Sequence, residues 1–161
     1  MLAVKNGSQV TFSSSFAQNH ENFQLDFCQP SNAHAWCAYK NQIGESIQVS
    51  SEVARIYIGL ILQGRGDHDQ WPTTIKAAYS MNGKDEAYVD EGRIFPACSD
   101  RSTKRYIYFN YPVYARFIKI YPQTWNVHIS LRFDAIYVDD TGLIIKNGPT
   151  TNPPPPVLKP E

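Results

Sequence analysis

Short stretches with the two-residue periodicity of β-strands recur along this chain, and turn-forming residues separate them. Residues 116–121 and 131–137 alternate polar and apolar side chains, as half-buried strands do. No stretch shows a sustained periodicity of 3.6 residues, which a helix would require. The aromatic fraction of 13% also favours sheets. The pattern therefore predicts an all-β fold, an antiparallel sandwich or barrel.

The expected strands are short and are spread along most of the chain. They are Gln9 to Phe12, Ser46 to Val49, Arg55 to Gln63, Thr74 to Ser80, Ala87 to Tyr88, Lys104 to Phe109, Ala115 to Tyr121 and Ser130 to Val138. Asn82-Gly83 follows one of them and predicts a type I′ hairpin turn, which favours this dipeptide. A proline is hard to place inside a strand, so we expect the strand after Trp71-Pro72 to start late or to lie at an edge.

A length of 161 residues fits one domain, which we place at residues 1–148. Residues 149–161 form a Pro-rich tail with four consecutive prolines. Prolines in series cannot donate backbone hydrogen bonds and adopt the extended polyproline II helix. We expect this tail to lie outside the sandwich and to contact another chain.

Composition excludes several functions. The net charge is zero and the pI is about 6.9, so no basic field favours nucleic acid. Residues 1–7 lack the apolar run of a signal peptide. The three cysteines have no zinc-like spacing and are expected to be reduced thiols, with a Cys28–Cys37 bridge as the alternative. We expect a cytoplasmic protein, with cytoskeletal association or export without a signal peptide as alternatives.

The polar loop between Gln63 and Trp71 is the main candidate for a binding surface, because loops on a rigid sheet commonly carry function. Asp67, His68 and Asp69 offer hydrogen bonds to a sugar beside an aromatic ring, although a solvated turn is the alternative interpretation. Two aspartates fall short of the six to eight oxygen ligands of calcium. We therefore expect no cofactor, with calcium as the alternative.

Other functions find little support in the residues. The four histidines lie in unrelated turns, and no Gly-x-Ser-x-Gly motif is present, so we expect no enzyme. The loop tips at 18–22 and 66–69 are polar or acidic, which argues against membrane insertion. Arg65-Gly66-Asp67 matches an adhesion tripeptide, but a structural role of Arg65 at the base of the loop is the favoured interpretation.

Several motifs together resemble the discoidin domain, the coagulation factor V/VIII type C family. The resemblance covers residues 32–138, and the loop from Gly64 to Trp71 is most similar to the discoidin lectins of social amoebae. The motifs, in family order, are Ala35-Trp36-Cys37-Ala38, Ile47-Gln48-Val49, Gln63-Gly64-Arg65, Tyr79-Ser80-Met81-Asn82-Gly83, Ser99-Asp100-Arg101-Ser102-Thr103, Ala115 to Pro122, and His128-Ile129-Ser130-Leu131-Arg132.

The resemblance implies a discoidin-type, jelly-roll-like β-sandwich with its ligand surface on loops at one end. By position these loops are Phe16 to Phe23, Tyr39 to Glu45 and Gly64 to Trp71. Family members are non-catalytic and bind galactose-type sugars, phospholipid head groups or proteins. The family often joins its first and last strands by a disulfide, but no cysteine follows Cys98, so that bridge is absent here.

We therefore expect a non-catalytic binding module whose loop end holds a galactose-type carbohydrate or a protein. The alternative is a small structural subunit docked in a large intracellular assembly, such as a cytoskeletal or ciliary complex. The candidate ligand-binding residues are Asn41, Arg65, Asp67, His68, Asp69 and Trp71.

Overall fold

The structure, a computed structural model, describes residues 1–16, 22–28 and 34–138. Its elements are β1 (Gln9–Phe12), η2 (Asp26–Cys28), β2 (Trp36–Cys37), β3 (Ile47–Gln63), β4 (Trp71–Ser80), β5 (Ala87–Tyr88), η3 (Val89–Gly92), β6 (Phe95–Pro96), β7 (Arg105–Asn126) and β8 (Ser130–Val138). The Pro-rich tail and the boundary predicted at residue 148 lie outside the described residues, and both stay predictions.

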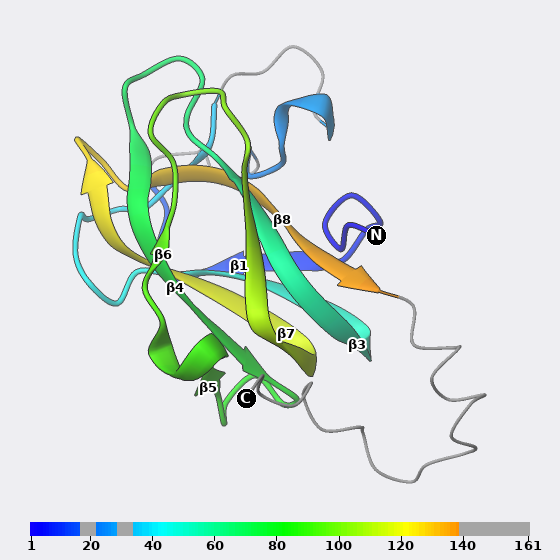
Figure 1. Cartoon of the computed structure of the whole chain (residues 1–161). Helices are drawn as coiled ribbons and strands as arrows, with labels where there is room; N and C mark the ends of the chain where they lie inside the picture. Colours follow the sequence, from blue (N-terminus) through cyan, green and yellow to red (C-terminus); the bar gives the residue numbers. More distant parts are fainter. Residues whose placement is uncertain (17–21, 29–33, 139–161) are drawn as a thin grey trace, which may run out of the picture.

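The strands form an antiparallel β-sandwich in which β3 and β7 each run through both layers (Figure 1). The first half of β3 pairs with β1, and its second half pairs with β8. In the same way, β7 pairs with β3 along both halves and with β4 near its C-terminal end. Between the layers lies an apolar core whose largest fully buried side chains include Trp36, Tyr57, Phe95 and Phe133. The all-β fold expected from the sequence is confirmed.

Two strands are longer than the sequence indicated. The expected strands 46–49 and 55–63 are parts of β3, which shifts register between Ser50 and Arg55. Likewise, the expected strands 104–109 and 115–121 are parts of β7. Register shifts of this kind bend a strand, so each long strand can turn from one layer into the other. We call the place where both strands turn the corner end.

The last strand, β8, is buried on both faces, although its alternation predicted a half-buried strand. Leu131, Phe133 and Ala135 face the core as expected. On the opposite face, Arg132 and Asp134 are only 2% and 1% exposed. The N-terminal segment covers this face, because the Asp134 carboxylate accepts hydrogen bonds from the amides of residues 4 and 5 at 2.7 and 2.9 Å.

The turn after β4 differs from the predicted type I′ hairpin. A type I′ turn needs positive φ at both central residues, but only Gly83 has it, with φ 79°. Instead the Asn82 carboxamide oxygen accepts the amides of Lys84 and Asp85, each at 2.9 Å. The side chain thus supports a longer connection between Ser80 and β5, because asparagine caps such turns well.

Strand β4, which contains Pro72, was expected to start late or to lie at an edge, and both alternatives are wrong. It begins at Trp71 and pairs with β7 on one side and with β5 and β6 on the other. Trp71 and Pro72 pair with Asn126 and Trp125 of β7, and the register shifts between Pro72 and Thr74. The irregularity accommodates a residue that cannot donate to the ladder. Among the described residues, no helix has the length and apolarity needed to cross a membrane.

Candidate functional site

The loop between β3 and β4 rises from one end of the sandwich, at the top of Figure 1, and its first residues are tightly fixed. The fully buried Gln63 side chain donates to Asp26 Oδ2 at 2.9 Å and to the carbonyl of Ser102 at 2.6 Å. A Cβ on Gly64 would lie 2.7 Å from the carbonyl oxygen of Asp100. Only glycine fits there, which gives Gln63-Gly64 a structural role.

Arg65 continues this fixed base. Its Nε lies 2.7 Å from Asp67 Oδ1, and its side chain is only 13% exposed. Burial raises the pKa of Asp67, but the hydrogen bond and charge of Arg65 outweigh it and hold that pKa below its ordinary value. The two charges of the Arg65-Gly66-Asp67 tripeptide therefore neutralise each other. This geometry supports the structural interpretation of Arg65.

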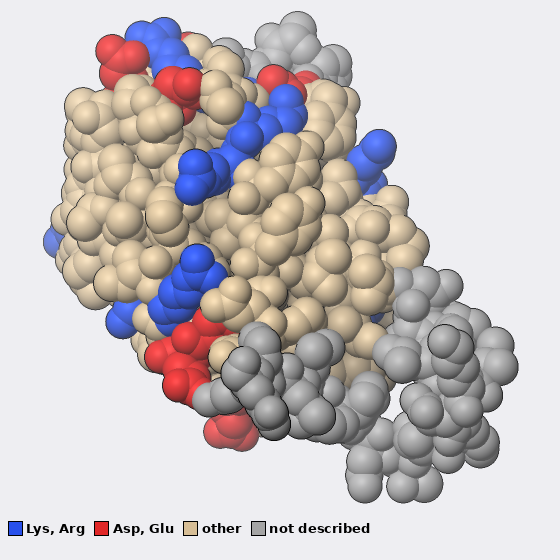
Figure 2. Space-filling view, in the orientation of Figure 1, with Lys and Arg blue, Asp and Glu red and all other residues tan. Residues whose placement is uncertain are grey.

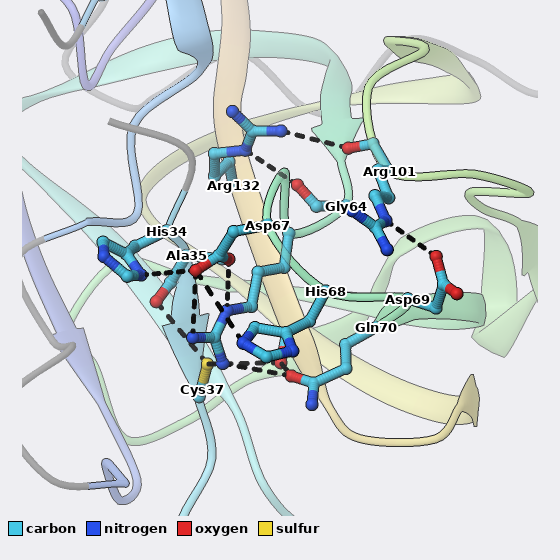
Figure 3. A network of polar contacts seen from close by, with 12 residues as sticks. His34, Ala35, Cys37, Gly64, Asp67, His68, Asp69, Gln70, Arg101 and Arg132 are labelled. Carbon is cyan, nitrogen blue, oxygen red and sulfur yellow. Dashed lines mark hydrogen bonds and ion pairs between the residues drawn. The ribbon is translucent and has the colours of Figure 1, made fainter. Parts of the chain in front are cut away.

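A small polar network beneath the loop holds Arg65 from the other side (Figure 3). Its Nη1 donates to Gln70 Oε1 at 3.2 Å and approaches Cys37 Sγ at 3.5 Å. Ser130 Oγ lies 2.9 Å from the same Gln70 oxygen and 3.2 Å from Cys37 Sγ. Strands β2 and β8 thus help to fix the conformation of the loop.

Arg132 of β8 joins this loop to the neighbouring one. The side chain is buried, and its Nε donates to the carbonyl of Gly64 at 2.7 Å. Its Nη2 donates to the carbonyl of Arg101 at 3.0 Å. Burial lowers the pKa of Arg132. One buried guanidinium therefore sets the spacing of the Gly64 loop and the loop that carries Arg101.

Two histidines lie on the outer side of Asp67. His34 Nδ1 is 3.1 Å from Asp67 Oδ2, and His68 Nε2 is 3.9 Å from the same oxygen. Their side chains are 45% and 57% exposed, and that of Asp67 is 31% exposed. Figure 3 shows both imidazoles beside this carboxylate. A solvent-facing cluster of donors and acceptors results.

Asp69 belongs to a second, more exposed pair. Arg101 Nε lies 2.7 Å from Asp69 Oδ1, and the side chains are 43% and 66% exposed. The backbone of Asp69 is fixed separately, because Asn126 Nδ2 donates to its carbonyl at 2.8 Å. The carboxylate–guanidinium pair is thus held in place while its outer edges remain open to solvent.

The remaining predicted residues, Asn41 and Trp71, also make contacts within the scaffold. Asn41 Oδ1 accepts the amide of Ile129 at 2.8 Å, and its Nδ2 donates to the carbonyl of Val127 at 3.3 Å. Trp71 is partly buried and packs against the core. Both were predicted to contact ligand and stay candidates; in the structure Asn41 also joins two loops and Trp71 also packs at the start of β4.

Apolar side chains also face solvent around these loops. Phe16, Tyr39, Ile43 and Val127 are 50–70% exposed. The ring of Phe16 packs edge-on against His128 at 6.1 Å between centroids. The sequence argument that the loop tips are polar overlooked these residues. Part of the first predicted loop, residues 17–21, lies outside the described residues.

The structure thus brings Arg65, Asp67 and His68 together and places Asp69 in a neighbouring pair. His34 and Arg101 were missed as site residues because the chain separates them from the loop by about thirty positions, as the contacts His34–Asp67 and Arg101–Asp69 show. The Ser99 to Thr103 motif was the available signal for Arg101. Within residues 1–16, 22–28 and 34–138, no three His, Cys, Asp or Glu side chains gather to hold a metal ion.

Comparison with known proteins identifies the class. The F5/8 type C domain model matches residues 9–134, so this chain belongs to the F5/8 type C domain family. One of the Discoidin-1 polypeptides of Dictyostelium discoideum is 37% identical over 127 residues, which are 79% of this chain and 49% of that protein. The chain therefore spans about half the length of this curated relative.

Solved structures agree with the family. Discoidin II from Dictyostelium discoideum superposes with a TM-score of 0.79 at 29% identity, covering 86% of this chain and 58% of that one. The module CpGH89CBM32-5 from Clostridium perfringens, solved in complex with GalNAc-β-1,3-galactose, gives a TM-score of 0.67 at 14% identity and covers 84% of this chain and 99% of that one. The second likeness shows the fold alone. The fold and the family together identify the chain as a binding domain.

Proposed function

We propose that the loop end of this domain binds a galactose-type sugar and performs no catalysis. The observation that carries the proposal is the exposed polar row formed by His68, Asp69 and Arg101 above a fixed base. Neighbouring sugar hydroxyls can donate to a carboxylate and accept from a guanidinium at the same time. Because Arg132 fixes the backbone at Arg101 and Asn126 fixes the backbone at Asp69, little ordering is needed on binding.

Exposed aromatic rings on the other two predicted binding loops support a sugar ligand. Tyr39 is 60% exposed and Phe16 is 50% exposed. Sugar sites combine a few polar groups with an apolar surface against which the C–H face of the ring packs. The sequence likeness to Discoidin-1 and the fold shared with a module solved with GalNAc-β-1,3-galactose point the same way.

The test compares retention of variants on a galactose resin. We expect His68→Ala with Asp69→Asn to lose retention, since each lost polar contact is worth about 1–3 kcal/mol. Asp67 is left unchanged because it pairs with Arg65. Lys84→Ala, in the exposed turn after β4, is the control that should bind normally. Melting temperatures of all three proteins should agree closely.

Retention of the double variant at the wild-type level would place the sugar elsewhere. A wild-type protein that binds no galactose resin and no sugar on a glycan array would overturn the sugar proposal. A protein ligand is the second candidate, because Ile43 and Val127 are 64% and 70% exposed. Their loops are joined through Asn41, so both side chains belong to one end.

The alternative role as a small structural subunit rests in part on the docking expected of residues 149–161. These lie outside the described residues, so the tail contact, the cytoskeletal or ciliary role and the cytoplasmic location stay predictions.

A further inference from the structure

A cavity of about 460 Å³ opens at the corner end, where β3 turns between the layers. It lies away from the binding loops, because β3 reaches the Gly64 loop only at its far end, Gln63. Figure 1 shows the lower right ends of β3 and β7 there, with the loops at the top. The lining residues used below are Ser8, Gln9, Ser50, Glu52, Arg55 and Arg116.

The chain path explains why a cavity forms here. Pairing of β3 with β7 is interrupted between Ser50 and Arg55, so the residues between them bulge away from the ladder. On the other side, Gly7 has φ 95° and turns the N-terminal segment into β1. The bulge and this turn line the cavity together.

Arg55 enters the cavity wall from β3 and is incompletely satisfied. Its guanidinium stacks over the ring of Tyr137, with Cζ 4.2 Å from the centroid. Its Nη1 is buried and has no hydrogen-bond partner within residues 1–16, 22–28 and 34–138. A buried N–H group without an acceptor costs free energy. Arg55 Nη1 can therefore donate a hydrogen bond to an acceptor on a bound ligand without a change in the stacking of the side chain on Tyr137.

Arg116 supplies a second guanidinium from β7. Its Nε donates to the carbonyl of Ser51 at 3.0 Å, which fixes the side chain. Neither Arg55 nor Arg116 forms an ion pair with an acidic side chain of residues 1–16, 22–28 and 34–138. Glu52 is the one acidic group that the described part of the chain contributes to the lining. Two guanidinium groups and one carboxylate leave one positive charge.

We propose that the corner cavity binds a sugar that carries one carboxylate, such as a uronic acid residue. The guanidinium fork matches a carboxylate in shape and charge. The excess of one positive charge suits a monoanion, whereas a phosphate dianion would meet Glu52. Ser8, Gln9 and Ser50 add neutral donors and acceptors for sugar hydroxyls. The volume also lies within the range of small-ligand sites, about 300–1,000 Å³.

The experiment titrates the full chain with D-glucuronate and follows backbone amide signals by NMR. Signals of Ser8, Ser50 and Arg116 should shift and saturate, whereas D-glucose and inorganic phosphate should leave them nearly unchanged. Arg116→Gln should weaken binding about tenfold or more, since a charge-assisted hydrogen bond is lost. Glu52→Gln should tighten it, because a repulsive charge is removed. Arg105→Gln, at the start of β7, is the control that should bind normally.

Three results would overturn the proposal: no saturable shift at the corner end, equal affinity for glucose and glucuronate, or unchanged binding by Arg116→Gln. Val138 pairs with Ile56 of β3, next to Arg55. A further variant changes the acidic pair Asp139-Asp140, which follows Val138 in the sequence. If only Asp139→Asn with Asp140→Asn binds glucuronate, that pair occupies the cavity and the proposal is wrong. Galactose retention uses the other end of the domain, so failure of either proposal leaves the other intact.

Discussion

Arginines stand at both ends of this domain, but their partners differ. At the loop end, Arg65 and Arg101 pair with the carboxylates of Asp67 and Asp69, and Arg132 donates to two backbone carbonyls. At the corner end, Arg55 stacks on a tyrosine ring, and Arg116 donates one hydrogen bond to a carbonyl. The guanidinium groups of the loop end therefore bind mainly to acceptors within the fold, whereas those of the corner end keep N–H donors that a ligand could use.

The difference shows that residue type alone does not identify a binding residue. Arg65 is a candidate ligand contact by its place in a polar loop, although a structural role was the favoured interpretation, and in the structure its charge is neutralised by Asp67. What remains open at the loop end are groups such as His68 and the outer edge of Asp69. The surface shown in Figure 2 agrees, since acidic and basic side chains lie close together at the upper end.

The largest expected effect is on stability, and it compares the buried Arg132 of the loop end with Arg116 of the corner cavity. Arg132→Met should lower the free energy of unfolding by about 3 kcal/mol, because two hydrogen bonds from a buried charge are lost. Arg116→Met should cost about 1 kcal/mol, the usual value of one hydrogen bond. Urea denaturation measures both. Equal losses would mean that internal partners do not distinguish the two ends.

The sequence predicted more of the scaffold than of the site. The alternation in β8 identified Leu131, Phe133 and Ala135 as core residues, and they are buried. The burial of Asp134 could not be predicted, because it depends on the distant N-terminal segment that donates to it. The His34–Asp67 contact is of the same kind. Periodicity reports which face of a strand is apolar, but it cannot report which remote segment covers the other face.

A smaller effect concerns the Arg65–Asp67 pair of the loop end, whose contribution to stability should depend on pH. Because Arg65 holds the pKa of Asp67 below its ordinary value, ionised Asp67 stabilises the fold. That contribution is present above the unfolded pKa, about 3.9, and is lost as the pH falls through the folded one. Asp67→Asn should therefore cost about 1 kcal/mol at neutral pH and progressively less as the pH falls below about 4.

Thermal unfolding of wild type and variant across this pH range makes the comparison. Asp69→Asn is the matched control, because its pair with Arg101 is exposed and should contribute less than about 1 kcal/mol. A larger loss for Asp69→Asn than for Asp67→Asn at neutral pH would reverse the assignment of Asp67 to the base of the loop and of Asp69 to its open edge.

The smallest expected effect is that of reductant, which should leave both ends unchanged. Cys28, Cys37 and Cys98 are free thiols in the described residues. Burial raises the pKa of Cys98 to about 12, with Asp100 adding to the shift, and burial also raises the pKa of Cys37. Thiols that stay protonated are poor nucleophiles for disulfide exchange. Melting temperatures with and without dithiothreitol should agree, whereas a required disulfide would add about 2–4 kcal/mol. If reductant lowered the melting temperature by several degrees, a disulfide would be present. Were Cys37 one of its partners, the contacts of Cys37 Sγ with Arg65 and Ser130 would have to be revised.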